Sequence, residues 1–298
     1  MSTVRHYLSL VKFSHTIFAL PFAIIGFFLG VDALAREQGQ SWLDVKSLSF
    51  WGWKGLLVLI CMVTARSAAM AFNRYLDRRF DAKNPRTAIR EIPAGIIAAE
   101  SALRFVIGNA VVFMIATWFI NPICFYLSPV ALFVILFYSY TKRFTALCHL
   151  VLGLGLSLAP IGAFLAVTGY FAWLPIFFSL AVLTWVSGFD IIYALQDEQF
   201  DRSHQLHSIP VALGTVKALR VSEILHVFSA TALATAGWWG GMGVLFWVGW
   251  VGFSGMLIYQ HVLVKPHDLS RVNLAFMTAN GIASVVFALC VLGDLLWA

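Results

Sequence analysis

Two clusters of acidic residues lie at the ends of long apolar runs, where carboxylates are costly and are therefore usually functional. Each cluster has the spacing DxxxD, and each has a further polar residue four or seven positions earlier. The members are Asn73, Asp77 and Asp81 in the first cluster, and Asp190, Asp197 and Asp201 in the second. Carboxylates that converge repel each other and need cations. Because the clusters supply oxygen ligands, a hard ion such as Mg2+ is expected.

Basic residues follow the clusters and favour an anionic ligand. Mg2+ usually keeps few protein ligands and shares its coordination shell with phosphate oxygens, so a Mg2+–diphosphate ligand would neutralise both clusters. Arginine and lysine side chains would then hold the remaining anionic oxygens. The candidates are Lys83, Arg86, Arg90, Arg202, Lys142 and Arg143.

The spacing of these residues predicts that each cluster forms one stripe on a helix. A helix turns by about 100° per residue, so positions four or seven apart point in nearly the same direction. Arg66 lies seven residues before Asn73 on the first stripe. Asp190 lies seven residues before Asp197 on the second, with Tyr193 beside it. Each predicted helix therefore carries a carboxylate pair near its end and an ionisable residue deeper in the membrane.

The composition predicts an all-α integral membrane protein with a single domain over residues 1–298. Hydrophobic residues make up 60% of the chain and charged residues 11%, and the mean hydropathy is +0.85. Apolar stretches recur at the length of a membrane-spanning helix, about 20 residues, and backbone polar groups in hydrocarbon favour helices. The nine expected spans are residues 15–34, 52–75, 97–119, 122–140, 147–167, 171–195, 217–238, 242–263 and 273–296.

The placement of basic residues predicts the orientation of the chain. With a cytoplasmic N-terminus and nine alternating spans, 16 of the 20 lysines and arginines fall on the cytoplasmic side, and Arg36, Lys46 and Lys54 on the other. We therefore expect the N-terminus inside, and the acidic clusters at the cytoplasmic face of a cell inner membrane. The same surplus accounts for most of the net charge of +6, so no nucleic-acid partner is expected.

The surroundings of the two clusters resemble each other. Residues 77–81 are followed by Ile-Pro-Ala-Gly at 92–95, and residues 197–201 by Ile-Pro-Val-Ala at 209–212. The offset of 120 residues between the acidic pairs contains four predicted helices. An even number of crossings keeps both copies on one side, so we expect a parallel internal repeat around a central cavity. The two motifs are residues 66–95 and 190–214.

Three runs of the sequence carry a resemblance to a known family. They are Arg66-x3-Met70-x2-Asn73-Arg74-x2-Asp77-x3-Asp81 with Pro85-Arg86-Thr87-x2-Arg90-x2-Pro93-x-Gly95, Asp190-x2-Tyr193-x3-Asp197-x3-Asp201 with Ser208, and Tyr138-Ser139-Tyr140-Thr141-Lys142-Arg143. These runs resemble the UbiA superfamily of intramembrane prenyltransferases, above all its 4-hydroxybenzoate polyprenyltransferase branch. The resemblance covers nearly the whole chain. One departure is Arg74, where many members carry aspartate.

The resemblance implies Mg2+-dependent transfer of a polyprenyl group from polyprenyl diphosphate to an aromatic acid, 4-hydroxybenzoate or a hydroxynaphthoate, in ubiquinone or menaquinone biosynthesis. It also implies nine helices around a cavity that opens sideways to the lipid bilayer. The implied metal ligands are Asp77, Asp81, Asp197 and Asp201. The implied diphosphate ligands are Asn73, Arg86, Arg90, Lys142, Arg143 and Tyr138. The implied catalytic residues are Asp190, Arg66 and Tyr193, and the implied acceptor-binding residues are Arg66, Asp190 and Lys12.

Such a reaction passes through an allylic cation, which aromatic faces can stabilise while they exclude water. The aromatic candidates are Tyr138, Tyr140 and Tyr193. Asp190 is expected to polarise the acceptor hydroxyl or to take the ring proton, and Arg66 or Lys12 to pair with the acceptor carboxylate. An alternative interpretation is that Arg66 and Asp190 form a buried ion pair with each other.

Two other classes of protein share some of these features. An ion-coupled transporter would also use a parallel repeat and intramembrane acids, but here the acids lie towards one face rather than at the bilayer centre. An alcohol phosphotransferase of lipid synthesis would concentrate its acids in one motif. A zinc hydrolase of the HExxH type is excluded because that motif is absent.

Overall fold

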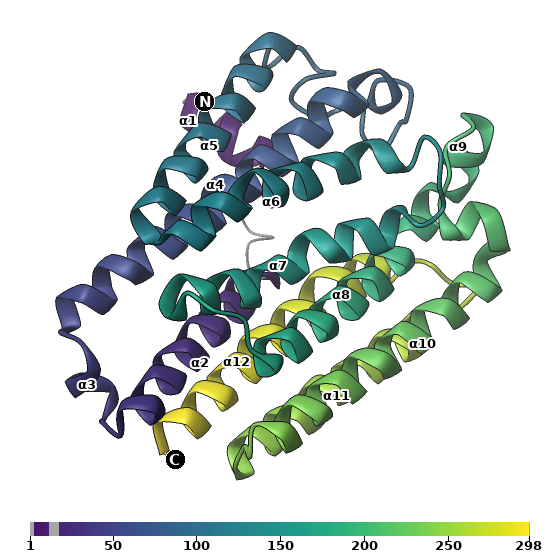
Figure 1. The fold of residues 1–298 in the computed structure, drawn as a ribbon. Coiled ribbons are helices and arrows are strands. Elements are labelled where there is room, and N and C mark those ends of the chain that lie inside the picture. Colours follow the sequence, from purple (N-terminus) through teal and green to yellow (C-terminus); the bar gives the residue numbers. More distant parts are fainter. Residues whose placement is uncertain (1–2, 12–17, 298) are drawn as a thin grey trace.

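The computed structural model describes residues 3–11 and 18–297, and every regular element in these residues is helical (Figure 1). The elements are α1 (Thr3–Leu10), α2 (Leu20–Gln38), α3 (Trp42–Val45), α4 (Leu48–Asp81), α5 (Ala99–Ile120), α6 (Pro122–Thr141), α7 (Cys148–Thr168), α8 (Trp173–Ala194), the 3-10 turn η2 (Leu195–Asp197), α9 (Glu198–Ser203), α10 (Ile209–Trp239), α11 (Val244–Leu263), the π-helical turn η3 (Leu274–Ala279) and α12 (Asn280–Trp297). The predicted all-α fold is confirmed.

The long helices correspond to the predicted spans, but not all are apolar enough to qualify as membrane spans by composition. Among the described residues, nine helices have at least 18 residues: α2, α4, α5, α6, α7, α8, α10, α11 and α12. Six segments are both long and apolar enough to cross a membrane, namely Ser49–Asp81, Ala99–Ile120, Pro122–Thr141, Cys148–Thr168, Trp173–Ser203 and Leu274–Trp297. The protein is therefore a multi-pass membrane protein, and the total of nine spans stays a prediction.

Side-chain caps and proline fix where several of these helices begin. Ser47 accepts a hydrogen bond from the Phe50 amide (3.3 Å) at the start of α4. Ser208 accepts one from the Val211 amide (3.3 Å) at the start of α10, and Pro210 lies within the first turn of this helix. Gly214, with φ of +75°, bends α10 just beyond this start. The segment after the second acidic cluster therefore turns sharply into a new helix.

The core is aromatic and is centred on α8. Trp185 and Phe178 of α8 are fully buried, and they pack with Phe22 of α2, Phe253 of α11 and Phe287 of α12. Figure 1 shows α4, α5 and α6 on one side of the bundle and α10 and α11 on the other, with α2, α7, α8 and α12 between them. These rings are buried and pack closely against one another. Close packing of such large side chains fixes the central helices rigidly.

The two acidic clusters lie at the same end of the bundle. Asp77 and Asp81 end α4, whereas Asp197 lies in η2, directly after α8. The Asn84 amide, three residues beyond α4, donates a hydrogen bond to Asp197 Oδ1 (3.1 Å). The same-side arrangement that the internal repeat predicts is therefore present in the structure.

Candidate active site

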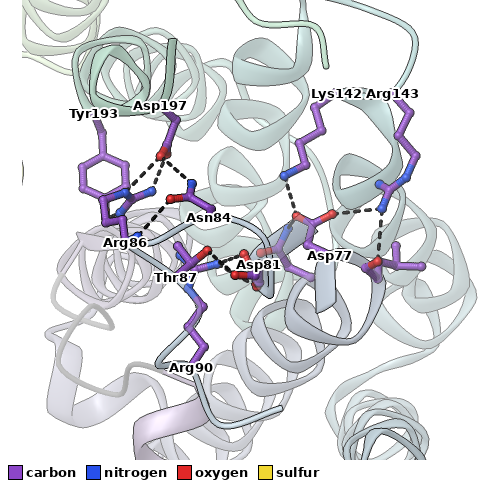
Figure 2. Close-up of polar contacts among 12 residues, drawn as sticks. Asp77, Asp81, Asn84, Arg86, Thr87, Arg90, Lys142, Arg143, Tyr193 and Asp197 are labelled. Atoms are coloured by element: carbon purple, nitrogen blue, oxygen red, sulfur yellow. Dashed lines mark hydrogen bonds and ion pairs between the residues drawn. The ribbon is translucent and has the colours of Figure 1, made fainter. Parts of the chain in front are cut away.

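Asp77 is buried and is held by two cations from another helix end. Only 2% of the residue is exposed. Its carboxylate accepts Lys142 Nζ at 2.6 Å and Arg143 Nη2 at 2.9 Å (Figure 2). Asn73, one turn earlier on α4, donates its amide to Asp77 Oδ2 at 3.3 Å. The stripe predicted for α4 is confirmed for this pair, and it faces the end of α6.

Arg143 fastens the end of α6 to the end of α4. Besides Asp77, its guanidinium donates to the Ser139 carbonyl (2.7 Å) and to the Leu76 carbonyl (3.2 Å). These carbonyls lie near helix C-termini, where cations are favourable because the helix dipole is negative there. Arg143 is therefore held in place by the backbone as well as by the acid.

Asp81 is paired with a cation from the loop that follows it. Arg90 Nη1 contacts both carboxylate oxygens of Asp81, at 2.8 and 3.0 Å. The loop folds back because Thr87 donates its hydroxyl to the Asp81 carbonyl (3.2 Å) and Asn84 Oδ1 accepts the Arg86 amide (3.0 Å), an Asx turn around Pro85. Local turn chemistry thus returns the basic residues of this loop to the acids (Figure 2).

Asp197 of the second cluster is paired with Arg86 from the first motif. Arg86 donates Nε to Asp197 Oδ1 (3.0 Å) and Nη2 to Oδ2, in a bidentate pair. Its Nη1 donates to the Tyr193 hydroxyl (3.0 Å), and the guanidinium lies 5.4 Å from the centroid of that ring. Burial lowers the pKa of Arg86, but its hydrogen bonds and charge interactions with Asp197 and Tyr193 together outweigh this effect, so the pKa is raised and the side chain stays cationic. The two motifs form one site (Figure 2).

Three of the four predicted metal ligands are therefore neutralised by the predicted diphosphate ligands. The fourth, Asp201, is half-buried, and no hydrogen bond or ion pair joins its carboxylate to another described residue. Within residues 3–11 and 18–297, no group of three or more acidic, histidine or cysteine residues is placed to hold a metal alone. The donor set still fits Mg2+, because this ion usually binds one or two carboxylates together with phosphate oxygens.

Asp190 has a partner that the sequence did not indicate. His149 of α7 is 2% exposed, and its Nδ1 lies 2.7 Å from Asp190 Oδ2. In the described residues the ion partner of Asp190 is thus His149, and the expected alternative of a buried Arg66–Asp190 pair is wrong. The Nε of Arg66 is buried and has no hydrogen-bond partner in the part of the chain that the structure describes. Sequence spacing could not have linked residues 149 and 190, because the contact depends on how α7 packs against α8.

An apolar cavity of about 410 Å³ lies between α4, α5, α6 and α7. Arg66 and Tyr138 line it on the side of the acidic clusters. Among its other lining residues, Val130 is 58% and Phe171 54% exposed, so the cavity reaches the lipid-facing surface between α6 and α7. From Arg66 to Lys54, which is 12 residues earlier on α4, the distance along the helix is about 18 Å.

Polar side chains join the helices at the far end of this cavity. Lys54 donates its ammonium to the carbonyls of Ile120 (2.5 Å) and Ala166 (3.2 Å). Asn121 donates its amide to the carbonyls of Leu165 (2.8 Å) and Ala166 (3.3 Å). These bonds join α4, the α5–α6 turn and α7 at the end opposite the acidic clusters.

The remaining predicted residues are placed as follows. Tyr138 lies with Arg66 at the cavity. Arg74, the departure from the family pattern, is 3% exposed and its Nη1 has no hydrogen-bond partner among the described residues. Lys12 lies outside the described residues. Asn84, which bridges the motifs, was not predicted, although its place before Pro85 marks a turn.

This arrangement defines a class of protein. A bundle of membrane-spanning helices gathers carboxylates and cations at one end, beside an apolar cavity open to lipid, and this suits an intramembrane enzyme for amphipathic anionic substrates. The chain belongs to the UbiA prenyltransferase family, whose model matches residues 19–282. It is therefore an enzyme that transfers alkyl groups.

Relatives and solved structures agree with this assignment. The chain is 31% identical to the 4-hydroxybenzoate octaprenyltransferase of Tolumonas auensis over 223 residues, which cover 75% of this chain and 78% of the relative. It is 30% identical to that of Nitrosospira multiformis over 243 residues, 82% of this chain and 83% of the relative. The apo structure of a UbiA homolog from Aeropyrum pernix K1 has a TM-score of 0.77 and 27% identity, and covers 95% of this chain and 97% of that chain.

A further solved structure shares the fold at lower identity. The UbiA homolog from Archaeoglobus fulgidus bound to DMAPP and Mg2+ has a TM-score of 0.70 and 18% identity. The match covers 98% of this chain and 99% of that chain. The fold described above is therefore shared over almost the full length of both proteins.

Proposed function

We propose that the protein transfers a polyprenyl group from polyprenyl diphosphate to an aromatic acid, 4-hydroxybenzoate or a hydroxynaphthoate, in quinone biosynthesis, with Mg2+ as cofactor. One observation carries the proposal: Arg86 of the first motif pairs with Asp197 of the second, so both acidic motifs form one charged site. The names of the 4-hydroxybenzoate octaprenyltransferase relatives and the homolog bound to DMAPP and Mg2+ support it.

Substrate binding would exchange the partners of the charged groups. Asp77, Asp81, Asp197 and Asp201 would hold the Mg2+, which offsets negative charge on the diphosphate when it is bound. The cations now paired with these acids would turn to the phosphate oxygens. They are Arg86, Arg90, Lys142 and Arg143. Asn73 lies beside Asp77 and would join them.

The prenyl chain would occupy the apolar cavity between α4, α5, α6 and α7. Its lining is mostly apolar, and it reaches the lipid-facing surface, from which a lipid substrate would enter. Tyr138 at the inner end and Tyr193 beside Arg86 offer aromatic faces to an allylic cation. An apolar lining also excludes water, which would otherwise capture the cation.

The acceptor would bind between the deeper ionisable residues of the two motifs. Arg66 has a buried Nε without a partner among residues 3–11 and 18–297, and an aromatic carboxylate would satisfy it. Asp190 would accept the hydroxyl proton or the ring proton of the acceptor. Lys12 is a second candidate for the acceptor carboxylate.

We also propose nine membrane spans with a cytoplasmic N-terminus, in the inner membrane of a bacterial cell. The excess of lysine and arginine on the side of the acidic clusters supports this orientation. The charged substrates would then reach the site from the cytoplasm.

A transfer assay tests the proposed reaction. Purified protein receives Mg2+ and a labelled prenyl diphosphate, with 4-hydroxybenzoate and dihydroxynaphthoates offered in parallel. We expect a prenylated product from at least one acceptor class, and none after EDTA treatment. Lack of transfer to every aromatic acid by a folded protein that binds prenyl diphosphate would contradict the proposal.

A further inference from the structure

His149 and Asp190 form a pair that the proposed reaction does not yet use. His149 lies on the first turn of α7, and Asp190 lies on the last turns of α8. Among the described residues, Asp190 Oδ2 is bonded at 2.7 Å to His149 Nδ1 and no partner is bonded to Oδ1, while the Asp190 side chain is 23% exposed. The second carboxylate oxygen is thus available to a ligand while the first is held.

The other ring nitrogen shows which atom of His149 donates to Asp190. The His149 Nε2 lies 3.3 Å from the backbone nitrogen of Ile209, whose N–H can only donate. Nδ1 is therefore the ring nitrogen that donates to the Asp190 carboxylate.

This geometry excludes a proton relay through His149. A relay would need Nε2 to release or accept a proton on its far side, where the Ile209 N–H lies and can only donate. The ring therefore acts on Asp190 by orientation.

The surrounding backbone holds the ring rigidly. Ser187, one turn before Asp190, donates its hydroxyl to the His149 carbonyl (3.1 Å). A Cβ at Gly153, one turn after His149, would lie only 2.4 Å from the Leu183 carbonyl oxygen, so α7 and α8 are in direct backbone contact here. His149 therefore has little freedom to change its position relative to Asp190.

We propose that His149 is the positioning residue of Asp190. Its Nδ1–H fixes one carboxylate oxygen, so that the other is oriented towards the acceptor. The inference rests on the role of Asp190 in the proposed function. It adds that the orientation of this carboxylate is set by three elements, α7, α8 and the start of α10, at which Ile209 lies.

Two variants of His149 separate orientation from mere packing. The Asn amide nitrogen can take the place of Nδ1, whereas the longer Gln places its amide near the position of Nε2. His149→Asn therefore keeps the donor to Asp190, and His149→Gln keeps only the group that faces Ile209. We expect His149→Gln to lower kcat about 10- to 100-fold with an unchanged KM for prenyl diphosphate, as loss of an orienting contact does. His149→Asn should stay within about threefold of wild type.

A double variant provides the decisive control. Because His149 acts through Asp190, His149→Gln combined with Asp190→Asn should be no slower than Asp190→Asn alone. Equal losses in His149→Asn and His149→Gln, or additive losses in the double variant, would overturn the proposal. Binding of a labelled prenyl diphosphate is measured in each variant to verify folding. A wild-type protein that transfers to no aromatic acid would instead overturn the proposed function, on which this role depends.

Discussion

Removal of Arg90 should raise the affinity of the site for a divalent metal in the absence of diphosphate. In the structure, Asp81 is available to a metal only after it breaks its contacts with Arg90 Nη1 at 2.8 and 3.0 Å. The two side chains are 8% and 24% exposed, so water replaces this pair poorly. The affinity for a metal alone is therefore reduced by the free energy needed to break the Asp81–Arg90 pair. When the metal binds together with diphosphate, the phosphate oxygens become new partners for Arg90.

The size of the effect follows from the strength of the pair. Hydrogen bonds to charged groups contribute about 1.5–3 kcal/mol, and about 1.4 kcal/mol corresponds to a tenfold change in affinity. Arg90→Gln should therefore strengthen binding of the metal alone by about 10- to 100-fold. With diphosphate present the gain should disappear, because the same variant removes a phosphate ligand. The coupling between metal and diphosphate should fall by the same factor in both directions.

Binding of Mn2+, followed by its electron paramagnetic resonance signal, measures this coupling with and without a non-reactive prenyl thiodiphosphate. Arg79→Gln is the matched control. Arg79 lies in the last turn of α4, close in sequence to Asp81, and carries the same charge as Arg90, but it is exposed and forms no ion pair with an acid in the described residues. An unchanged or weaker affinity for Mn2+ alone in Arg90→Gln, relative to Arg79→Gln, would refute the exchange of partners.

Three further substitutions test other parts of the site. Asp197→Ala should abolish prenyl transfer because it removes a metal ligand and frees Arg86. The control Asp44→Ala in α3 should keep wild-type rates. An active Asp197→Ala variant would contradict the metal assignment. Arg66→Ala should raise the KM for the acceptor at least about tenfold, as loss of a charge-assisted contact does, and an unchanged KM would remove this role. Ala131→Trp fills the cavity, so transfer of long prenyl chains should fall more than that of dimethylallyl groups, in parallel assays with Val227→Trp as a surface control.

Helical periodicity predicted the parts of the site that lie on continuous helices. Asn73 and Asp77 face the same way because they are one turn apart, and the structure joins them by a hydrogen bond. The pairing of Arg86 with Asp197 depends on an Asx turn at Asn84, and no periodic pattern encodes the direction in which a loop returns. The cations could be named from the sequence, but their individual partners could not.

Tertiary packing explains the predictions that were wrong or incomplete. Arg66 and Asp190 were expected at a similar depth in the membrane and could therefore have formed an ion pair. Because α7 packs against α8, the partner of Asp190 is instead His149. Hydropathy alone leaves the number of spans open, and one reason is that α10 carries Lys217, Arg220 and Glu223 in its first half. Helix existence follows from length and apolar content, whereas such charges lower the apparent membrane propensity of a helix that the bundle still accommodates.

The hydrogen bonds of Lys54 and Asn121 at the far end of the cavity bear on the fate of the product. These side chains bind the carbonyls of Ile120, Leu165 and Ala166, which line the cavity, so they hold α4, the α5–α6 turn and α7 together at the end opposite the acidic clusters. A hydrophobic chain in the cavity would then leave where the lining reaches the surface of the bundle, as it does at Val130, and pass into the lipid. The enzyme would thus release its product into the membrane without carrying the tail through water.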